Sequence, residues 1–166
     1  MCGISGFINK NLPENKKQIL LKGLSELQAH RGPDFSGEWN TSNVHFFHQR
    51  LSLIDGNSRS NQPFFNEEFV LCFNGEIYNF LALKQHLPTV NFTTTSDTEV
   101  LFQYLIHFGI QKTLRDIKGM FAFSFYDVKK KKLFLVRDRF EIKPLFFVNN
   151  SEVFAFASES RTLAKG

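Results

Sequence analysis

The chain has 166 residues, of which 42% are hydrophobic and 22% charged, and this composition excludes an intrinsically disordered protein. Its length fits one compact domain with little room for a second. The formal net charge of +4 does not indicate a nucleic-acid partner, because four of the basic residues form one run at 129–132 between apolar segments, where a solvated hairpin turn explains them.

Cysteine content and hydropathy narrow the protein class further. Two cysteines, Cys2 and Cys72, are too few for a disulfide scaffold and fit a reducing compartment. No apolar stretch reaches the roughly 18 residues that a membrane span needs. No basic region precedes the apolar N-terminal residues, so a secretory signal is not expected. We therefore expect a cytoplasmic protein without a membrane partner, whose 21 Phe residues build an aromatic core.

The first part of the chain predicts short strands around one amphipathic helix. Residues 16–29 place leucines on one helical face, and a turn follows at 30–34. Asn79 is expected to cap a short helix that Pro88 stops. Strands are predicted at residues 4–8, 44–47, 51–54 and 69–73.

The second part predicts a helix and then a strand-rich end. Ser96 and Glu99 fit a capping box, which opens a helix that ends at Gly109. A shorter helix is expected at 113–117, and strands at 120–126, 133–136, 145–148 and 153–157. Strands that are apolar on both faces must be covered twice, so the pattern favours an α+β fold with packed sheets.

The cysteine at position 2 indicates a specific chemistry. Because its side chain is small, Met1 can be removed, and Cys2 then carries both a thiol and a free α-amine. Such an amine has a pKa of about 7.7 to 8.0, so it can act as general base beside its own thiol near neutral pH. The alternative is a small apolar residue at the start of a strand.

Asn74, Gly75 and Glu76 come directly after the strand expected at 69–73. A strand end that turns on Gly can direct a backbone N–H and a side-chain amide to one point. Stabilising the oxyanion of an acyl-transfer intermediate requires such a pair of donors. An ordinary Asn-Gly hairpin turn is the alternative.

Two residues of opposite charge, Arg50 and Asp97, fit a ligand that carries both a negative and a positive group. Arg50 stands at the head of the run 51–54, where a guanidinium can bind a carboxylate through two hydrogen bonds, and a surface salt bridge is the alternative. Asp97 can accept an ammonium group, although an acid in the first turn of a helix is also favoured by the macrodipole. Cys72 lies inside a hydrophobic strand and is expected in the core.

No metal or nucleotide site is expected in this domain. The five histidines are scattered and do not form the His-Glu-x-x-His pattern of a metal site. A Gly-rich phosphate loop is also absent, so we expect no cofactor.

The order of the motifs along the chain is more specific than any one of them. The motifs are Met1-Cys2-Gly3-Ile4, Arg31-Gly32-Pro33-Asp34, Arg50-Leu51-Ser52, Asn74-Gly75-Glu76-Ile77-Tyr78-Asn79, Ser96-Asp97-Thr98-Glu99, Gly119-Met120-Phe121-Ala122-Phe123 and Arg137-Asp138-Arg139-Phe140. With this series the sequence resembles the class II glutamine amidotransferases. Within them it is most similar to the N-terminal glutaminase domain of glutamine-hydrolysing asparagine synthetase.

The resemblance implies a fold and a set of roles. The fold is the four-layer αββα sandwich of N-terminal-nucleophile hydrolases, with two antiparallel sheets between helix layers. Cys2 is implied as the nucleophile, with Asn74 and Gly75 as the oxyanion hole. The residues implied to bind glutamine are Arg50, Leu51, Ser52, Leu53, Ile54, Asn74, Gly75, Glu76 and Asp97.

The residues themselves agree with this chemistry. Glutamine is a zwitterion with a neutral amide, so its site needs a cation, an anion and a nucleophile near an oxyanion hole. The resemblance implies that the released ammonia serves amide synthesis, by inference asparagine from aspartate, in a synthetase domain in cis or in trans. ATP and Mg are then expected only in that synthetase domain.

The sequence also departs from the family. Glu141 stands where the family usually has Gly, and it is strained if the backbone there needs a positive φ. Gly56-Asn57 replaces a more usual apolar-polar pair. We interpret 1–166 as the type-2 glutaminase domain, either a truncated piece or a short stand-alone protein, because the family's synthetase domain is missing from this sequence.

Three alternatives stay open at this point. The first is a catalytically degenerate binding or regulatory module of the same fold. The second is an N-terminal-Cys amidase for another amide, and the third is an amidotransferase that serves a different acceptor. The pair Arg50 and Asp97 argues against the second, since an apolar acyl group needs neither charge. The oligomeric state is open.

Overall fold

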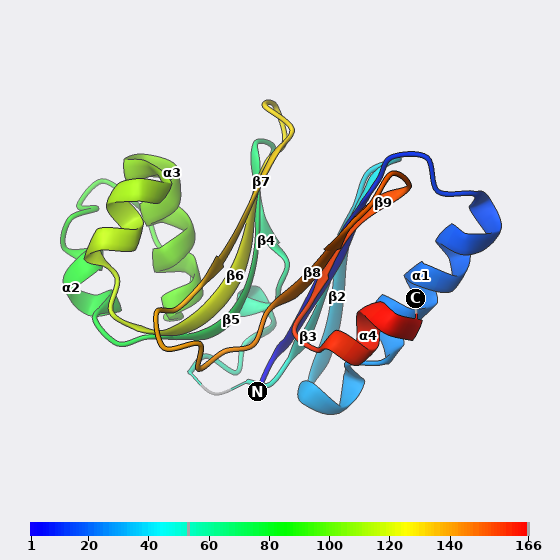
Figure 1. The fold of residues 1–166 in the computed structure, drawn as a ribbon. Helices are drawn as coiled ribbons and strands as arrows, with labels where there is room; N and C mark the ends of the chain where they lie inside the picture. Colours follow the sequence, from blue (N-terminus) through cyan, green and yellow to red (C-terminus); the bar gives the residue numbers. More distant parts are fainter. Residues whose placement is uncertain (53, 166) are drawn as a thin grey trace.

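The computed structural model describes residues 1–52 and 54–165, which form two antiparallel sheets between helices (Figure 1). The strands are β1 (Gly3–Asn9), β2 (Phe35–Asn40), β3 (Val44–Arg50), β4 (Phe64–Phe65), β5 (Phe69–Ile77), β6 (Gly119–Asp127), β7 (Lys132–Arg137), β8 (Phe146–Asn149) and β9 (Val153–Ala157). The helices are α1 (Glu14–Glu26), α2 (Phe80–Lys84), α3 (Asp97–Asp116) and α4 (Ser160–Lys165), with 3₁₀ turns at Ala29–Arg31 and Ser58–Ser60.

The elements stack in four layers. One sheet has the strand order β2-β3-β1-β9-β8 and the other β4-β5-β6-β7, and every pairing in both is antiparallel. Helices α1 and α4 lie on the outer side of the first sheet, and α2 and α3 on the outer side of the second (Figure 1). The expected αββα sandwich of the α+β class is therefore confirmed.

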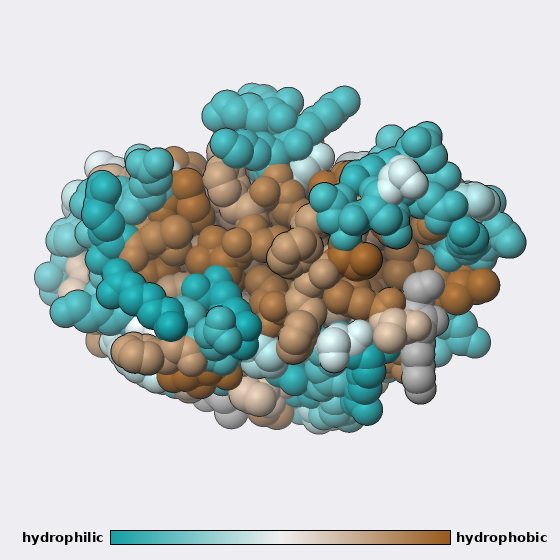
Figure 2. All heavy atoms as spheres, viewed as in Figure 1, coloured by the Kyte–Doolittle hydropathy of each residue, from teal (hydrophilic) through white to brown (hydrophobic). Residues whose placement is uncertain are grey.

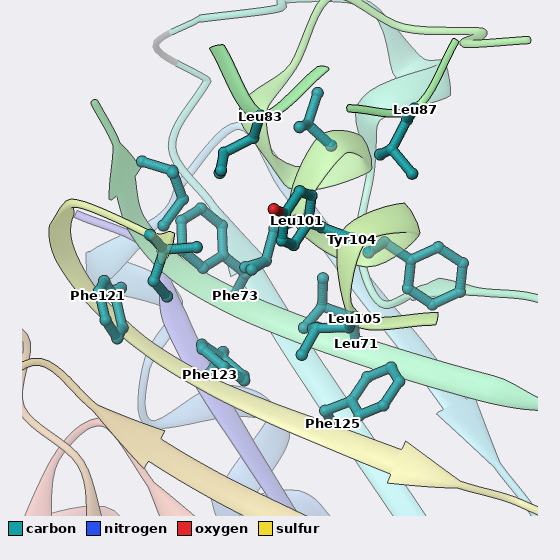
Figure 3. Close-up of a cluster of buried hydrophobic side chains, with 14 residues drawn as sticks. Leu71, Phe73, Leu83, Leu87, Leu101, Tyr104, Leu105, Phe121, Phe123 and Phe125 are labelled. Atoms are coloured by element: carbon teal, nitrogen blue, oxygen red, sulfur yellow. The ribbon is translucent and has the colours of Figure 1, made fainter. Parts of the chain in front are cut away.

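Aromatic side chains fill the layers, as the Phe content predicts. Strand β6 shows the pattern most clearly, because Phe121, Phe123 and Phe125 pack toward α3 while Ala122 and Tyr126 pack between the two sheets. Figure 3 shows the first of these clusters, where the phenylalanines of β5 and β6 meet the leucines of α2 and α3. Each face of this strand is thus covered by a different layer.

The strand expected at 51–54 is wrong. Strand β3 runs on to Arg50, and Leu51, Ser52 and Ile54 lie outside any strand, while residue 53 falls outside the described residues. The reason lies in the Arg50 side chain, whose guanidinium donates to the carbonyls of Asp55 and Asn57. Because the chain curls around this cation, it leaves the sheet at Arg50.

The turn expected at Asn74-Gly75 is also wrong. Strand β5 continues to Ile77, with Asn74 opposite Ala122 and Gly75 opposite Phe121 in its ladder with β6. A Cβ at position 75 would lie 2.3 Å from the carbonyl oxygen of Met120. Gly75 therefore serves close approach between strands rather than a turn.

The start of α3 follows its predicted signals in part. The Ser96 hydroxyl accepts a hydrogen bond from the Glu99 N–H at 3.3 Å, as in a capping box. The Glu99 carboxylate bonds instead to the N–H groups of Thr93 and Thr94. At Gly109, where the helix was expected to end, α3 kinks with a φ of 72°.

Asn79 precedes α2, as expected, but its side chain does not cap that helix. Its amide bonds instead to the Asp116 carbonyl and the Lys118 N–H, at 2.9 and 2.8 Å, and so joins α2 to the end of α3. The short strands β2 and β4 and helix α4 were not expected from the sequence.

The outer strand β8 carries exposed apolar residues. Phe146, Phe147 and Val148 are exposed, and on the face drawn in Figure 2 hydrophobic side chains gather over the region of β7 and β8. Lys129, Lys130 and Lys131 of the lysine run lie in the β6–β7 turn, as predicted, and Lys132 begins β7. None of the helices in the described ranges is both long and apolar enough to cross a membrane.

Candidate active site

A pocket with a volume of about 230 Å³ lies where the two sheets come together near the N-terminus. It gathers residues that are far apart in the sequence. Among those that line it are Cys2, Arg50, Asn74, Gly75, Glu76 and Asp97. The structure therefore brings the predicted nucleophile, oxyanion donors and charged residues into one cavity.

Cys2 lies immediately before β1, and its thiol sits beside the backbone of Leu51. The Sγ atom is 3.4 Å from the Leu51 N–H nitrogen and 3.6 Å from its carbonyl oxygen. The Cys2 carbonyl accepts a hydrogen bond from Arg31 Nε at 3.0 Å, which fixes the residue. Burial raises the pKa of the Cys2 thiol. The resting group is therefore a thiol, and it needs a base to become a nucleophile.

Asn74 presents an unused hydrogen-bond donor to this cavity. The residue is 2% exposed, and its Nδ2 has no hydrogen-bond partner among the described residues. A buried polar group without a partner costs folding free energy. Such a donor at the wall of a cavity is what an oxyanion hole needs before its ligand arrives.

The strand register directs the Gly75 N–H to the same place. Phe121, opposite Gly75, bonds through its N–H and C=O to Asp138, at 3.1 and 2.8 Å, so these groups point away from β5. In an antiparallel ladder the facing residue of such a pair also points its backbone groups outward. The Gly75 N–H therefore points away from β6, toward the free edge of β5.

The neighbours of Gly75 along this edge are bonded to side chains. The Phe73 N–H donates to Gln62 Oε1 at 2.7 Å, and the Phe73 carbonyl lies 3.0 Å from His48 Nε2. On the other side, the Ile77 N–H donates to Asp97 Oδ2 at 2.9 Å. The edge exists because β4 has only two residues and leaves the rest of β5 without a strand on that side.

Arg50 is held as a buried cation at one side of the pocket. It is 7% exposed, and besides the carbonyls of Asp55 and Asn57 its guanidinium donates to Asn61 Oδ1 at 2.8 Å. All these partners are neutral acceptors. The surface salt bridge considered for Arg50 is wrong, and its positive charge is available to an anionic ligand.

Asp97 supplies the opposite charge. It is 4% exposed at the start of α3, and burial raises its pKa to about 6, with the nearby Glu76 carboxylate acting in the same direction. A cation bound beside Asp97 would favour the ionised form. Asp97 thus begins the helix, as the macrodipole interpretation expects, and it also lines the cavity, where a partner for an ammonium group would have to lie.

Asp55, which was not expected at the site from the sequence, connects these two charged residues. Its Oδ2 accepts from the N–H and the hydroxyl of Thr95, both at 3.0 Å, and its Oδ1 accepts from the Asn57 N–H at 3.0 Å. These hydrogen bonds, first of all the one from the Thr95 N–H, lower the pKa of Asp55. The carboxylate thus ties the loop around Arg50 to the segment that precedes α3.

Some of the other residues predicted for the site line the pocket and others do not. Leu51 and Ile54 line the pocket, but Ser52 is not among the lining residues, because its N–H turns to Asp34 Oδ2 at 2.7 Å. Leu53 lies outside the described residues. Gln62 and Lys143 also line the cavity, and no motif in the sequence marks them. Cys72 is fully buried, as expected, and burial raises its pKa to about 12.

Among the described residues, no group of three or more His, Cys, Asp or Glu side chains is placed to hold a metal ion. The geometry combines a thiol beside the N-terminus with a buried amide donor, unbonded within the described residues, at the wall of the same pocket, inside an αββα sandwich. These features define the class of N-terminal-nucleophile hydrolases.

Residues 1–166 match the family described as glutamine amidotransferase domain, and the chain belongs to this family. It is similar to asparagine synthetase [glutamine-hydrolyzing] 2 of Bacillus subtilis strain 168, with 42% identity over 98% of this chain and 22% of that protein. It is also similar to asparagine synthetase B [glutamine-hydrolyzing] of Escherichia coli strain K12, with 40% identity over 88% of this chain and 26% of that protein. The chain thus spans about a quarter of the length of these relatives.

Solved structures give the same fold. Glutamine phosphoribosylpyrophosphate amidotransferase of B. subtilis matches with a TM-score of 0.76 and 21% identity, over 99% of this chain and 43% of that one. The structure of the allosteric regulatory enzyme of purine biosynthesis matches with a TM-score of 0.78 and 22% identity, over 98% of this chain and 43% of that one. The expected N-terminal-nucleophile hydrolase fold is confirmed, and the chain is an enzyme domain of the amidotransferase family.

Proposed function

We propose that this domain hydrolyses glutamine to glutamate and ammonia with Cys2 as nucleophile. The observation that carries the proposal is the meeting of the Cys2 thiol and the unpartnered Asn74 amide in one pocket, with Gly75 on the same free edge of β5. A thiol that shares a pocket with two N–H donors is suited to attack a carbonyl carbon. The relatives' names, which include the words glutamine-hydrolyzing, support this substrate.

The charges of the pocket fit the two ends of the amino acid. Arg50 would bind the α-carboxylate of glutamine through its guanidinium, whose hydrogen-bond partners among the described residues are all neutral. Asp97, with Glu76 beside it, would bind the α-ammonium group. Because Asp55 ties the supports of Arg50 and Asp97 together, the two charges keep a fixed separation. This arrangement favours a zwitterion over a simple acyl amide.

The chemical steps follow from the N-terminal position of Cys2. After removal of Met1, the Cys2 α-amine takes the thiol proton while sulfur attacks the amide carbon, and the oxyanion forms between the Asn74 amide and the Gly75 N–H. The amine then gives the proton to the leaving nitrogen, ammonia departs, and a γ-glutamyl thioester remains. Water attacks the thioester, its proton passes to the amine, and the released sulfur regains a proton as glutamate leaves.

We further propose that the ammonia serves amide synthesis, with aspartate as acceptor. Support comes from the names of the relatives, which are asparagine synthetases, and from the quarter of their length that this chain spans. The acceptor reaction would take place in a synthetase domain, in the same chain or in another, and ATP and Mg would act there. A different acceptor is the alternative for this part of the proposal.

The test begins with the mature N-terminus. Intact mass is expected to show loss of Met1, and purified protein is expected to release glutamate from glutamine. Cys2→Ala should abolish this release, whereas Cys72→Ala, which removes the thiol from the core, should keep it. Glutamate release by Cys2→Ala at the unchanged rate would overturn the mechanism. A mature chain that retains Met1 and releases no glutamate would support a binding or regulatory module instead.

A further inference from the structure

Lys143 places a buried ammonium group in the wall of the pocket. The residue is 6% exposed and lines the same cavity as Cys2. Its Nζ lies 3.2 Å from the Sδ atom of Met1, and no carboxylate among the described residues lies within 4.0 Å of it. Buried charges are normally paired, and a thioether is only a weak acceptor. Met1, the partner of the Lys143 ammonium, is therefore also the residue that must be removed before Cys2 can react as proposed.

The backbone around Lys143 fixes the residue in this position. Its N–H donates to Asp138 Oδ2 at 3.2 Å, and its carbonyl accepts from Arg137 Nε at 3.0 Å. The Asp138 carboxylate also accepts the N–H groups of Phe121, Phe140 and Ile142. The Asp138 carboxylate is thus engaged by backbone donors, and the Lys143 ammonium lies beside Met1 at the N-terminus.

The other charged groups around Cys2 are already matched or have another task. Arg31, from the 3₁₀ turn, bonds to the Cys2 carbonyl and pairs with Glu159 at 3.1 Å. Arg50, from β3, is the proposed partner of the substrate carboxylate. Glu76 and Asp97, from β5 and α3, line the pocket and are the proposed partners of the substrate ammonium. Among these cations, Lys143 is therefore the one to which neither the described part of the structure nor the proposed function assigns an anionic partner.

We propose that Lys143 is a positioning residue of the glutaminase reaction, whose ammonium lies beside the new N-terminus once Met1 is gone and disfavours a second positive charge there. The Cys2 α-amine is then kept neutral and ready to accept the thiol proton, while Lys143 contributes only its positive charge and transfers no proton. This inference rests on the proposed function of Cys2.

Electrostatics supports the direction of this effect. A like charge within a few ångströms disfavours the charged form of an amine, and it favours the anionic form of a thiol. Lys143 and Arg50 both act to lower the pKa of the Cys2 thiol, against the larger effect of burial. The same fixed charge thus favours the deprotonated form of both groups of Cys2.

The test is the pH dependence of kcat/KM for glutamine in processed protein. Lys143→Met keeps the length of the side chain and removes the charge, and Lys143→Arg keeps the charge. The acid limb of the Lys143→Met profile is expected to move to higher pH by about one unit, with near-normal activity on the alkaline side. Lys143→Arg is expected to restore the parent profile. Lys118→Met, which removes an exposed lysine outside the pocket, is the matched control and should leave the limb in place.

A second measurement does not depend on turnover. The pH at which iodoacetamide alkylates Cys2 at half its maximal rate should rise in Lys143→Met, and Cys72 is fully buried and serves as an internal reference. Should Lys143→Met fail to fold, Lys143→Gln takes its place in both measurements. An unmoved acid limb, or an equal loss of activity at every pH that Lys143→Arg does not repair, overturns the proposal. A parent protein that releases no glutamate at any pH overturns the proposed function instead.

Discussion

The imidazole of His48 and the carbonyl of Phe73 lie 3.0 Å apart and join the two sheets one residue before Asn74. His48 stands on β3 two residues before Arg50, so a single hydrogen bond links the strand of the proposed carboxylate site to the strand of the proposed oxyanion donor. Burial lowers the pKa of His48 to about 4, so the ring is neutral at physiological pH. Because Phe73 offers a carbonyl, the proton of the neutral ring must sit on Nε2.

Replacing His48 should therefore affect both stability and turnover. His48→Phe fills the space but leaves the Phe73 carbonyl buried without a partner, which should lower the free energy of unfolding by about 1 to 3 kcal/mol. We also expect a lower kcat with a smaller change in KM, because Asn74 loses a support. His48→Gln can donate again and should recover part of both. Urea unfolding and glutaminase kinetics check the result, and equal values for the two variants would contradict this role.

Asn74→Ala separates catalysis from folding. Loss of an oxyanion donor typically lowers kcat by about 10²- to 10³-fold. Because Nδ2 has no hydrogen-bond partner among the described residues, the free energy of unfolding should change by less than about 1 kcal/mol. Steady-state kinetics and denaturant unfolding of the same preparation measure the two effects. A fall in stability that parallels the fall in activity would assign Asn74 a structural role instead.

Asp97 should give glutamine binding a pH dependence. With the pKa of its carboxyl raised to about 6, Asp97 is increasingly protonated as the pH falls below that value, and a neutral carboxyl does not pair with an ammonium group. We expect KM for glutamine to rise by about tenfold per pH unit below this pKa. Asp97→Asn should bind glutamine poorly at every pH and lose this dependence. A KM of the parent protein that stays constant between pH 5 and 7 would contradict the assignment.

The same carboxyl should cost stability at neutral pH. Its folded pKa of about 6 lies above the ordinary 3.8, so the stability that the neutral form contributes is present below pH 3.8 and is lost as the pH rises through 6. Asp97→Asn keeps an acceptor for the Ile77 N–H without the buried charge. We expect it to raise the free energy of unfolding at pH 7 by about 1 to 2 kcal/mol. Thermal unfolding at pH 4 and pH 7 measures this, since the gain should shrink at the lower pH.

Gly75→Ala tests the close approach of β5 and β6. The added Cβ would meet the Met120 carbonyl oxygen at 2.3 Å, so the strands must part, and the N–H of residue 75 moves with them. Both stability and kcat should fall, the former by about 1 to 3 kcal/mol. Gly56→Ala is the matched control, because a Cβ there meets nothing within 4 Å. If the Gly75→Ala enzyme kept the parental activity, the assignment of the Gly75 N–H to the oxyanion hole would be wrong.

The fold was predictable because its signals are local. The alternation of Phe121, Phe123 and Phe125 requires a strand covered on both faces, and the structure supplies a helix layer on one side and the second sheet on the other. The strain expected at Glu141 is also borne out, since its φ is 57°. The strand pattern depends on a few neighbouring residues, whereas the expectation at Glu141 came from the resemblance to the family, which usually has Gly there.

The residue types of the site were predictable, but the backbone and the contacts that position them were not. Asn74 and Gly75 were expected at a turn, whereas the edge of β5 directs them, and that edge depends on how short β4 is. Asp55 and Lys143 were missed because their roles come from contacts with Thr95 and Met1, about 40 and 140 residues away along the chain, and neither contact leaves a local pattern.

The free edge of β5 has a consequence for the behaviour of the protein in concentrated solution. An unpaired strand edge is a template on which another chain can add itself and start aggregation. Here the backbone groups of Phe73 and Ile77 on that edge are already bonded to the side chains of Gln62, His48 and Asp97. An incoming strand would need these same backbone groups to be free. The side chains that shape the pocket thus also block the addition of a strand from another molecule. Their loss should therefore favour aggregation in addition to slowing the reaction.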